Sequence, residues 1–147
     1  MKSHILISTI VLLTSVSAFS KDQKTASAKV EQLVESTSAW DGTPYKSYPS
    51  GQPDLRVIRM TIPANTALPW HTHPYPNAGY VLKGQLTIED RDSGKKQTFK
   101  TGEAFPETVG GVHRGISGNT ETVLILTYSA VKGVPTFTSE PGEVDEY

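Results

Sequence analysis

The chain has 147 residues, with four His, no Cys, and 14 Lys and Arg against 15 Asp and Glu, which gives a formal charge of −1. That length supports one domain. The near-neutral charge argues against a nucleic-acid binder, which needs a basic surface. A sequence without Cys excludes disulfides, thiolate metal ligands and cysteine nucleophiles. The 12 Gly and 10 Pro instead favour a turn-rich globular domain.

Residues 1–20 have the pattern of a secretory signal peptide. A short start with Lys2 precedes a mostly apolar run over residues 5–16, which is shorter than the roughly 20 residues needed to cross a bilayer. Small residues then allow cleavage after Ala18 or Ser20. The alternatives are an uncleaved anchor or a buried strand. We expect a periplasmic or secreted protein that is not held at a membrane once the signal is removed.

Residues 21–54 are expected to form one short helix and a turn-rich lead-in. Across residues 27–35 the apolar Val30, Leu33 and Val34 recur at i, i+3 and i+4, as on one face of a helix. The glycines and prolines that follow the helix interrupt regular structure and predict turns.

Residues 55–130 are expected to form the strands of one β-domain. Short runs rich in β-branched residues or alternating in polarity are separated by turn residues. These runs are residues 55–62, 78–82, 85–89, 97–100, 103–108, 112–116 and 122–128. Strands at this spacing predict a sandwich or a closed barrel. Residues 131–147 are interpreted as an acidic C-terminal tail.

Three histidines fall within strand-like segments. His71 and His73 are separated by one residue, so on a strand both side chains point to the same face. His113 lies in a later strand-like run, and a sheet that folds back on itself brings that residue opposite the pair. The alternative is three unrelated surface histidines. The pattern favours a metal site formed by His71, His73 and His113.

The first histidine segment resembles a motif of the cupin superfamily, whose members are small jelly-roll barrels that hold a metal inside. That motif reads G-x5-H-x-H-x3,4-E-x6-G. His71, His73 and Gly84 match it, Asn65 stands at the first Gly position, and Asn77 stands at the Glu position. Asn tolerates a positive φ better than most residues, so the change at Asn65 is mild.

The second histidine segment resembles the second cupin motif, G-x5-P-x-G-x2-H-x3-N. Gly102, Gly110 and His113 match it, whereas Thr108 and Ser117 replace Pro and Asn. The strands extend this likeness over about residues 55–128. The resemblance implies an all-β cupin jelly-roll barrel, also called a double-stranded β-helix, to which the predicted N-terminal helix is added. It also implies a homodimer paired through an outer sheet.

Asn77 changes the expected metal site, because a neutral amide stands where the family has a carboxylate. Either the Asn77 amide oxygen binds the metal weakly, or three histidines form one face with open coordination positions. With neutral ligands alone a divalent ion keeps its full charge and favours anionic or enolised ligands. Iron, copper, nickel, manganese and zinc all suit imidazole, so the cofactor is expected to be one divalent transition metal ion.

Glu107 is the candidate catalytic residue. It stands six residues before His113, where the cupin pattern has an apolar residue. If it faces the cavity, it completes the metal shell or acts as a general acid or base. If it faces outward, it is a surface carboxylate on an edge strand.

The sequence is compatible with three functions. The first is an exported metalloenzyme acting on a small anionic or oxygen-rich substrate by dioxygenase-like or by isomerase- or lyase-like chemistry. The second is a non-catalytic binder of a metal or small ligand, and the third is a structural barrel braced by its metal. A catalytic metal needs an exchangeable position beside an open pocket, whereas a structural metal is four-coordinate and closed.

Overall fold

The computed structural model describes residues 27–145. The signal segment expected over residues 1–20 lies outside the described residues. The chain divides into two units, Met1–Val30 and Glu31–Tyr147, and every described strand lies in the second. Among residues 27–145 no helix has the length and apolar character that crossing a membrane requires.

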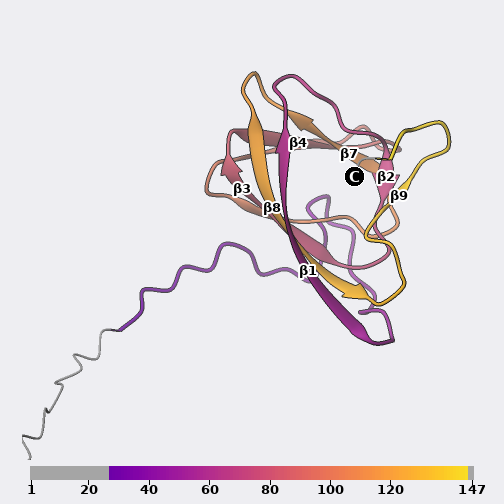
Figure 1. Ribbon diagram of the computed structural model, residues 1–147. Helices are drawn as coiled ribbons and strands as arrows, with labels where there is room; N and C mark the ends of the chain where they lie inside the picture. Colours follow the sequence, from indigo (N-terminus) through magenta and orange to yellow (C-terminus); the bar gives the residue numbers. More distant parts are fainter. Residues whose placement is uncertain (1–26, 146–147) are drawn as a thin grey trace, which may run out of the picture. The chain divides into compact units, whose positions relative to one another are not determined.

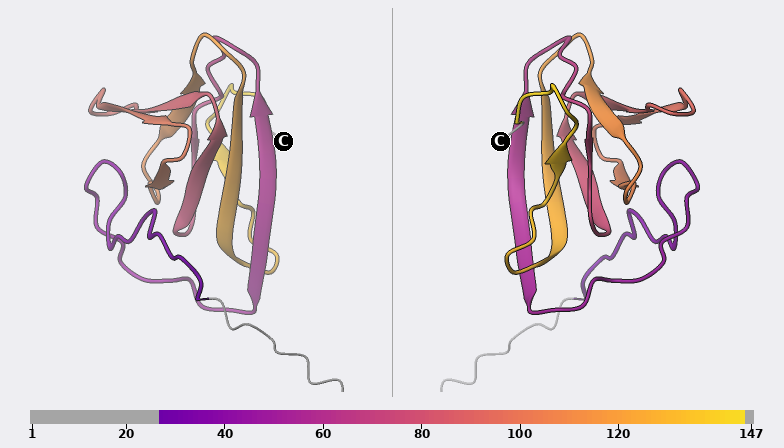
Figure 2. Two further views of the ribbon diagram at one scale, coloured as in Figure 1. Left: turned by 90° about the vertical axis from the view of Figure 1, so that its left-hand side faces the viewer. Right: turned by 90° about the vertical axis from the view of Figure 1, so that its right-hand side faces the viewer.

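The strands form two antiparallel sheets, shown in Figure 1. The first sheet has the order β1 (Pro53–Ile62), β8 (Thr122–Val131), β3 (Asn77–Lys83) and β6 (Ala104–Pro106). The second sheet has the order β5 (Lys96–Lys100), β4 (Gln85–Asp90), β7 (His113–Ser117), β2 (His71–Thr72) and β9 (Thr138–Ser139). The chain passes repeatedly between the sheets, whose layered arrangement is visible in Figure 2. The all-β jelly-roll prediction is confirmed, and β9 is a short strand that the sequence patterns did not indicate.

The core lies between the two sheets because alternate residues of each strand point inward. In β8 the burial alternates along the strand, with Leu124, Leu126 and Tyr128 buried. These residues pack with Ile88 of β4 and Phe105 of β6, among others. Burial of each large apolar side chain contributes about 1.5–3 kcal/mol, so the sheets are held together by the interior that also contains the histidines.

The predicted helix over residues 27–35 does not form, and residues 27–36 have no regular secondary structure. Its intended apolar face is exposed: Val30 is 86% accessible, Leu33 50% and Val34 37%. A helix of that length is only marginally stable in water unless an apolar face packs against something. The three apolar side chains keep the spacing of a helix face but remain too exposed to stabilise one.

The rest of the lead-in is attached to β6 and to the residue that follows it. The Trp40 backbone N–H donates to the Pro106 carbonyl at 2.9 Å, and the Tyr45 hydroxyl donates to the Glu107 carbonyl at 2.6 Å. Burial, with the nearby Glu107 and Asp41 carboxylates, raises the pKa of Tyr45 to about 12. The Tyr45 hydroxyl therefore remains a neutral donor across the ordinary pH range.

Asn65 and Gly84 show why the first motif requires unusual residues at its ends. Asn65 has a φ of 54°, in the left-handed region that Gly adopts readily and Asn tolerates. Gly84 has a φ of 79° in the β3–β4 turn, and a Cβ there would lie 2.5 Å from the Glu121 carbonyl oxygen. The replacement of Gly by Asn at position 65 therefore preserves the turn.

Replacement of Gly79 by Ala is expected to destabilise the barrel. A Cβ at Gly79 would lie 2.1 Å from the Phe105 ring, which is fully buried. Overpacking of this kind costs about 1–3 kcal/mol. Urea unfolding should show that loss for Gly79→Ala, whereas Ser129→Ala on the exposed face of β8 should stay within about 0.5 kcal/mol of the parent. Equal stability of the parent and Gly79→Ala would contradict this packing.

Candidate metal centre

Strand pairing brings the three histidines together. His71 of β2 is directly opposite His113 of β7 in the antiparallel register, and His73 follows His71 by two residues on the same inward side. The ring centroids are 4.7 Å apart for His71 and His113, 4.9 Å for His71 and His73, and 5.1 Å for His73 and His113. One ring nitrogen from each residue lies within 4.8 Å of the others, and all three side chains are buried. The predicted convergence of two distant segments is therefore present.

Backbone carbonyls orient all three rings. The Nδ1 atom of His71 lies 2.9 Å from the Pro69 oxygen, that of His73 2.8 Å from the Thr136 oxygen, and that of His113 2.9 Å from the Gly111 oxygen. A carbonyl oxygen only accepts, so each Nδ1 carries the proton and donates it. In the neutral ring the lone pair is then on Nε2, which is the arrangement that metal-binding histidines use.

The protonation of His71 and His73 suits metal binding. Burial, together with the neighbouring His73 and His113, lowers the pKa of His71 to about 4. Burial also lowers the pKa of His73. Both rings are therefore neutral at ordinary pH, as imidazole ligands must be.

Glu107 faces the histidines rather than solvent. It immediately follows β6, is 7% exposed, and has its Oε2 atom 3.3 Å from the Nε2 atom of His113. Burial opposes charge on both groups, but their mutual attraction is stronger, so the pKa of Glu107 is lowered and that of His113 is raised. Of the two orientations considered from the sequence, the cavity orientation is the one found.

Asn77 lies at the start of β3 and is also buried. It belongs to the inward face of that strand with Gly79 and Val81. Neither polar atom of its side chain has a hydrogen-bond partner. The residues that line the cavity beside the histidines include Glu107 and do not include Asn77, so a coordinating role for Asn77 remains a prediction.

The cavity beside the three histidines is small and fits a metal ion. Its volume is about 20 Å³, and its walls are otherwise mainly apolar. The Glu107 Oε2 and His113 Nε2 atoms that face it are buried without a hydrogen-bond partner. Buried polar groups in proteins are nearly always paired, and imidazole and carboxylate are ligands that a divalent transition metal ion accepts. The residues present therefore fit the ion that the sequence predicts.

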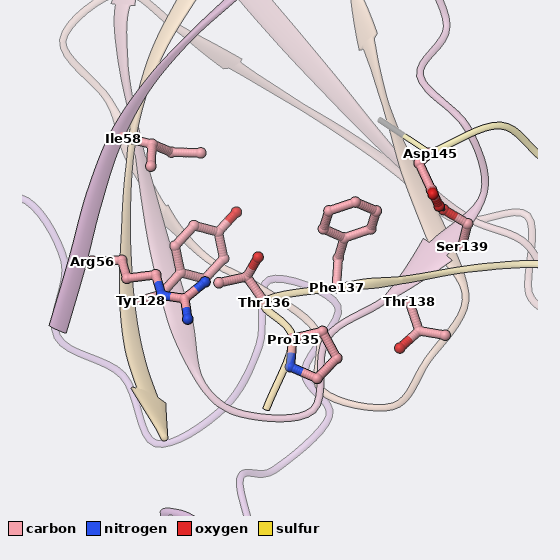
Figure 3. Close-up of a pocket in the computed structure, with 9 residues that line it drawn as sticks. All are labelled: Arg56, Ile58, Tyr128, Pro135, Thr136, Phe137, Thr138, Ser139 and Asp145. Atoms are coloured by element: carbon pink, nitrogen blue, oxygen red, sulfur yellow. The ribbon is translucent and has the colours of Figure 1, made fainter. Parts of the chain in front are cut away.

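A wider cleft lies next to this cavity, between β1 and the segment that leads into β9. Its volume is about 630 Å³. Figure 3 shows Arg56, Ile58 and Tyr128 on one side and residues 135–139 on the other. The Tyr128 ring lies 5.9 Å from that of His73, and the Phe137 ring 6.2 Å from that of His71. Tyr128 also lines the cavity beside the histidines, so the cleft and the cavity share this side chain.

Sequence reasoning missed the contribution of residues 135–139. Thr136 orients His73 through its carbonyl, Phe137 packs against His71, and β9 pairs with β2 at Ser139. The alternation of Thr and Phe over residues 136–138 is a weak strand signal that could have suggested this. The acidic composition of the following residues masked it.

The fold and these residues define a small jelly-roll barrel whose interior offers three imidazoles to a metal ion. Residues 58–128 match the Cupin_2 family model, described as a cupin domain. No curated protein matches the sequence. Residues 58–128 are thus identified as a cupin domain, as the two histidine motifs indicated.

Solved structures with the same fold include two enzymes. One is an oxalate oxidase in complex with the substrate analogue glycolate, at 24% identity and a TM-score of 0.50, covering 59% of this chain and 46% of that chain. The other is the DMSP lyase DddQ from Ruegeria pomeroyi DSS-3, at 15% identity and a TM-score of 0.53, covering 71% and 49%. This chain spans about half the length of these proteins, and at such identities the likeness concerns the fold.

Divalent metal ions are expected to stabilise the protein strongly. An ion at 1,000 times its dissociation constant adds about 4 kcal/mol, which raises Tm by roughly 8–16 °C for a chain of this size. Thermal unfolding with a chelator and then with Mn, Fe, Ni, Cu or Zn ions tests this. The matched variant is His73→Asn, in which the amide N–H can still donate to the Thr136 carbonyl while the Nε2 ligand is lost. If added metal does not raise the Tm of the parent, or raises the Tm of His73→Asn equally, the three histidines do not form a metal site.

Proposed function

We propose that this chain is a metal-dependent enzyme that acts on a small anionic or oxygen-rich substrate. The observation that carries the proposal is the set of three buried imidazoles, each with Nδ1 on a carbonyl and Nε2 left to bind a metal. His71, His73 and His113 are the proposed metal ligands. The reaction is of the dioxygenase or the isomerase and lyase type.

The residues around the ion support this function in separate ways. A bound divalent metal would supply Lewis-acid or redox chemistry at this position. The carbonyl contacts fix the rings, so little reorganisation is needed when an ion or substrate arrives. Apolar walls that include Met60, Leu86 and Leu126 exclude bulk water from the cavity, which strengthens every electrostatic interaction inside it.

The substrate class follows from the charge of the site and from its relatives. A divalent ion held by three imidazoles keeps a net positive charge even with one carboxylate beside it, so it attracts anionic oxygen ligands such as carboxylates and enediols. An oxalate oxidase with bound glycolate and a DMSP lyase are among the proteins with this fold. Both names describe small organic molecules as the ligand or substrate, which supports the same class here.

The wider cleft is the proposed substrate route. The cavity at the histidines has room for little more than a water molecule, so a substrate must bind in the cleft and reach the ion past Tyr128 and Phe137. The cleft is open to solvent and large enough for a small organic acid.

Export and pairing belong to the same proposal. The basic start and apolar run of residues 1–20 support a periplasmic or secreted location. β1 is an edge strand whose Leu55 and Val57 side chains are 78% and 61% exposed. Exposed apolar residues on an edge strand favour pairing with a second copy.

A second candidate is a non-catalytic metal binder. The small volume of the inner cavity favours it, because a closed site is typical of structural metals. The two candidates differ in whether an added ligand changes the coordination of the bound ion.

Turnover by the metal-loaded protein tests the proposed activity. Oxalate, glycolate, malonate and a catechol are presented to the protein loaded with each metal in turn, and oxygen uptake and substrate loss are recorded. We expect turnover of at least one compound and a loss of more than about 100-fold in His73→Asn. Thr138→Trp, which narrows the cleft at an exposed position of β9, should raise KM and leave metal affinity unchanged.

A protein that shows neither turnover nor any ligand-dependent change in the spectrum of its bound metal would support the second candidate.

The oligomeric state tests the pairing. We expect the parent to have the mass of a dimer by light scattering and the double variant Leu55→Asp with Val57→Lys to be monomeric. Thr61→Lys, on the same exposed face of β1, is the control and should remain dimeric. A monomeric parent would contradict the homodimer.

A further inference from the structure

We propose that Glu107 is the charged ligand of the metal and replaces the carboxylate that the cupin motif carries at the position of Asn77. This inference rests on the proposed function only in requiring that the three histidines hold a metal. The ligand set is then three imidazoles and one carboxylate, as in the cupin motif. The carboxylate comes from the residue after β6 instead of from β3.

The strand register places the two positions directly opposite each other. In the pairing of β3 with β6, Ala78 is opposite Pro106 and Gly79 is opposite Phe105. The next residues in this antiparallel register are Asn77 and Glu107, and the Glu107 backbone N–H donates to the Asn77 carbonyl at 3.0 Å. Side chains of directly opposite residues emerge on the same face of a sheet. A carboxylate moved from position 77 to position 107 thus shifts by one strand and still faces the interior.

The contact between Glu107 and His113 has the geometry of two ligands without their ion. His113 uses its Nδ1 proton for the Gly111 carbonyl, so in the neutral ring Nε2 is an acceptor. It faces the Oε2 atom of Glu107 at 3.3 Å, yet neither atom has a hydrogen bond. Ligand atoms about 2.1 Å from one metal, at angles of 90–109°, lie about 3.0–3.4 Å apart. The observed separation falls within that range.

The buried charge of Glu107 calls for a positive partner, which is either a protonated His113 or a bound metal ion. The side chain is buried, and among the described residues its ion-pair partner is His113. A buried carboxylate without a positive partner is strongly disfavoured. A metal beside it supplies the compensating charge while all three histidines stay neutral, and the net charge of the centre falls from +2 to +1.

The backbone around Glu107 is held as a ligand position requires. Its carbonyl accepts the Tyr45 hydroxyl at 2.6 Å, and the preceding carbonyl of Pro106 accepts the Trp40 N–H. Both contacts come from residues 40–45 of the lead-in. Asn77, in contrast, does not line the cavity beside the histidines.

Cobalt binding to a set of matched variants tests the proposal. The affinity for Co(II) is measured by competition with a chelator, and the visible spectrum of bound Co(II) reports its coordination. We expect Glu107→Gln to lose more than about 100-fold in affinity and to change the spectrum. The double variant Asn77→Glu with Glu107→Gln should recover at least 10-fold of that loss, because it restores the carboxylate at the family position. Glu121→Gln, an exposed carboxylate paired with Lys83, should bind as the parent does.

The outcomes separate this inference from the proposed function. Glu107→Gln with the affinity and spectrum of the parent would overturn the ligand role. A loss that Asn77→Glu fails to recover would overturn the equivalence of the two positions. If Glu107→Gln does not fold, Glu107→Asp gives the same reading, since a shorter carboxylate should weaken binding by at least 10-fold. A parent protein that binds no Co(II) would refute the metal site itself.

Discussion

The pairing of β2 with β7 is the constraint on which the site depends. It is a short contact, but it sets His71 directly opposite His113 and leaves His73 on the same inner side. Opposite residues on neighbouring strands have their Cβ atoms about 4.5–5.5 Å apart, which is a spacing that rings can span to reach one ion. The carbonyls of Pro69, Gly111 and Thr136 then fix how the rings turn. Strand register determines where the three imidazoles lie. The backbone carbonyls that accept from Nδ1 determine that Nε2 is the nitrogen left to bind a metal.

The sequence predicts those parts of the molecule that follow from local periodicity. Alternation with a period of two identified the long strands, and the spacing of His71 and His73 placed both rings on one face, since neither depends on distant contacts. A sheet that folds back on itself predicted that His113 lies opposite this pair, and the cupin resemblance supported that prediction. The sequence also predicts correctly that Asn can replace Gly at position 65, because that replacement depends only on the positive φ of the residue itself.

The features that the sequence did not predict depend on what a segment packs against. The helical period at Val30, Leu33 and Val34 is not matched by a buried apolar face. Strand β9 forms because it pairs with the edge of β2, and the short alternation over residues 136–138 was too weak a signal to predict that pairing. The side of the strand on which Glu107 lies could not be chosen from one charged residue among apolar neighbours. The register against Asn77 determines it.

The contacts of the lead-in indicate that the folded domain begins before the region that matches the family. The family match starts at residue 58, yet Trp40 and Tyr45 hold the two carbonyls that follow the buried Phe105. A fragment trimmed to the family boundaries would keep all three histidines and lose the clamp on the strand that carries Glu107. The region that matches the family is therefore smaller than the folded unit, and expression fragments of this barrel should begin before residue 38 to keep both contacts.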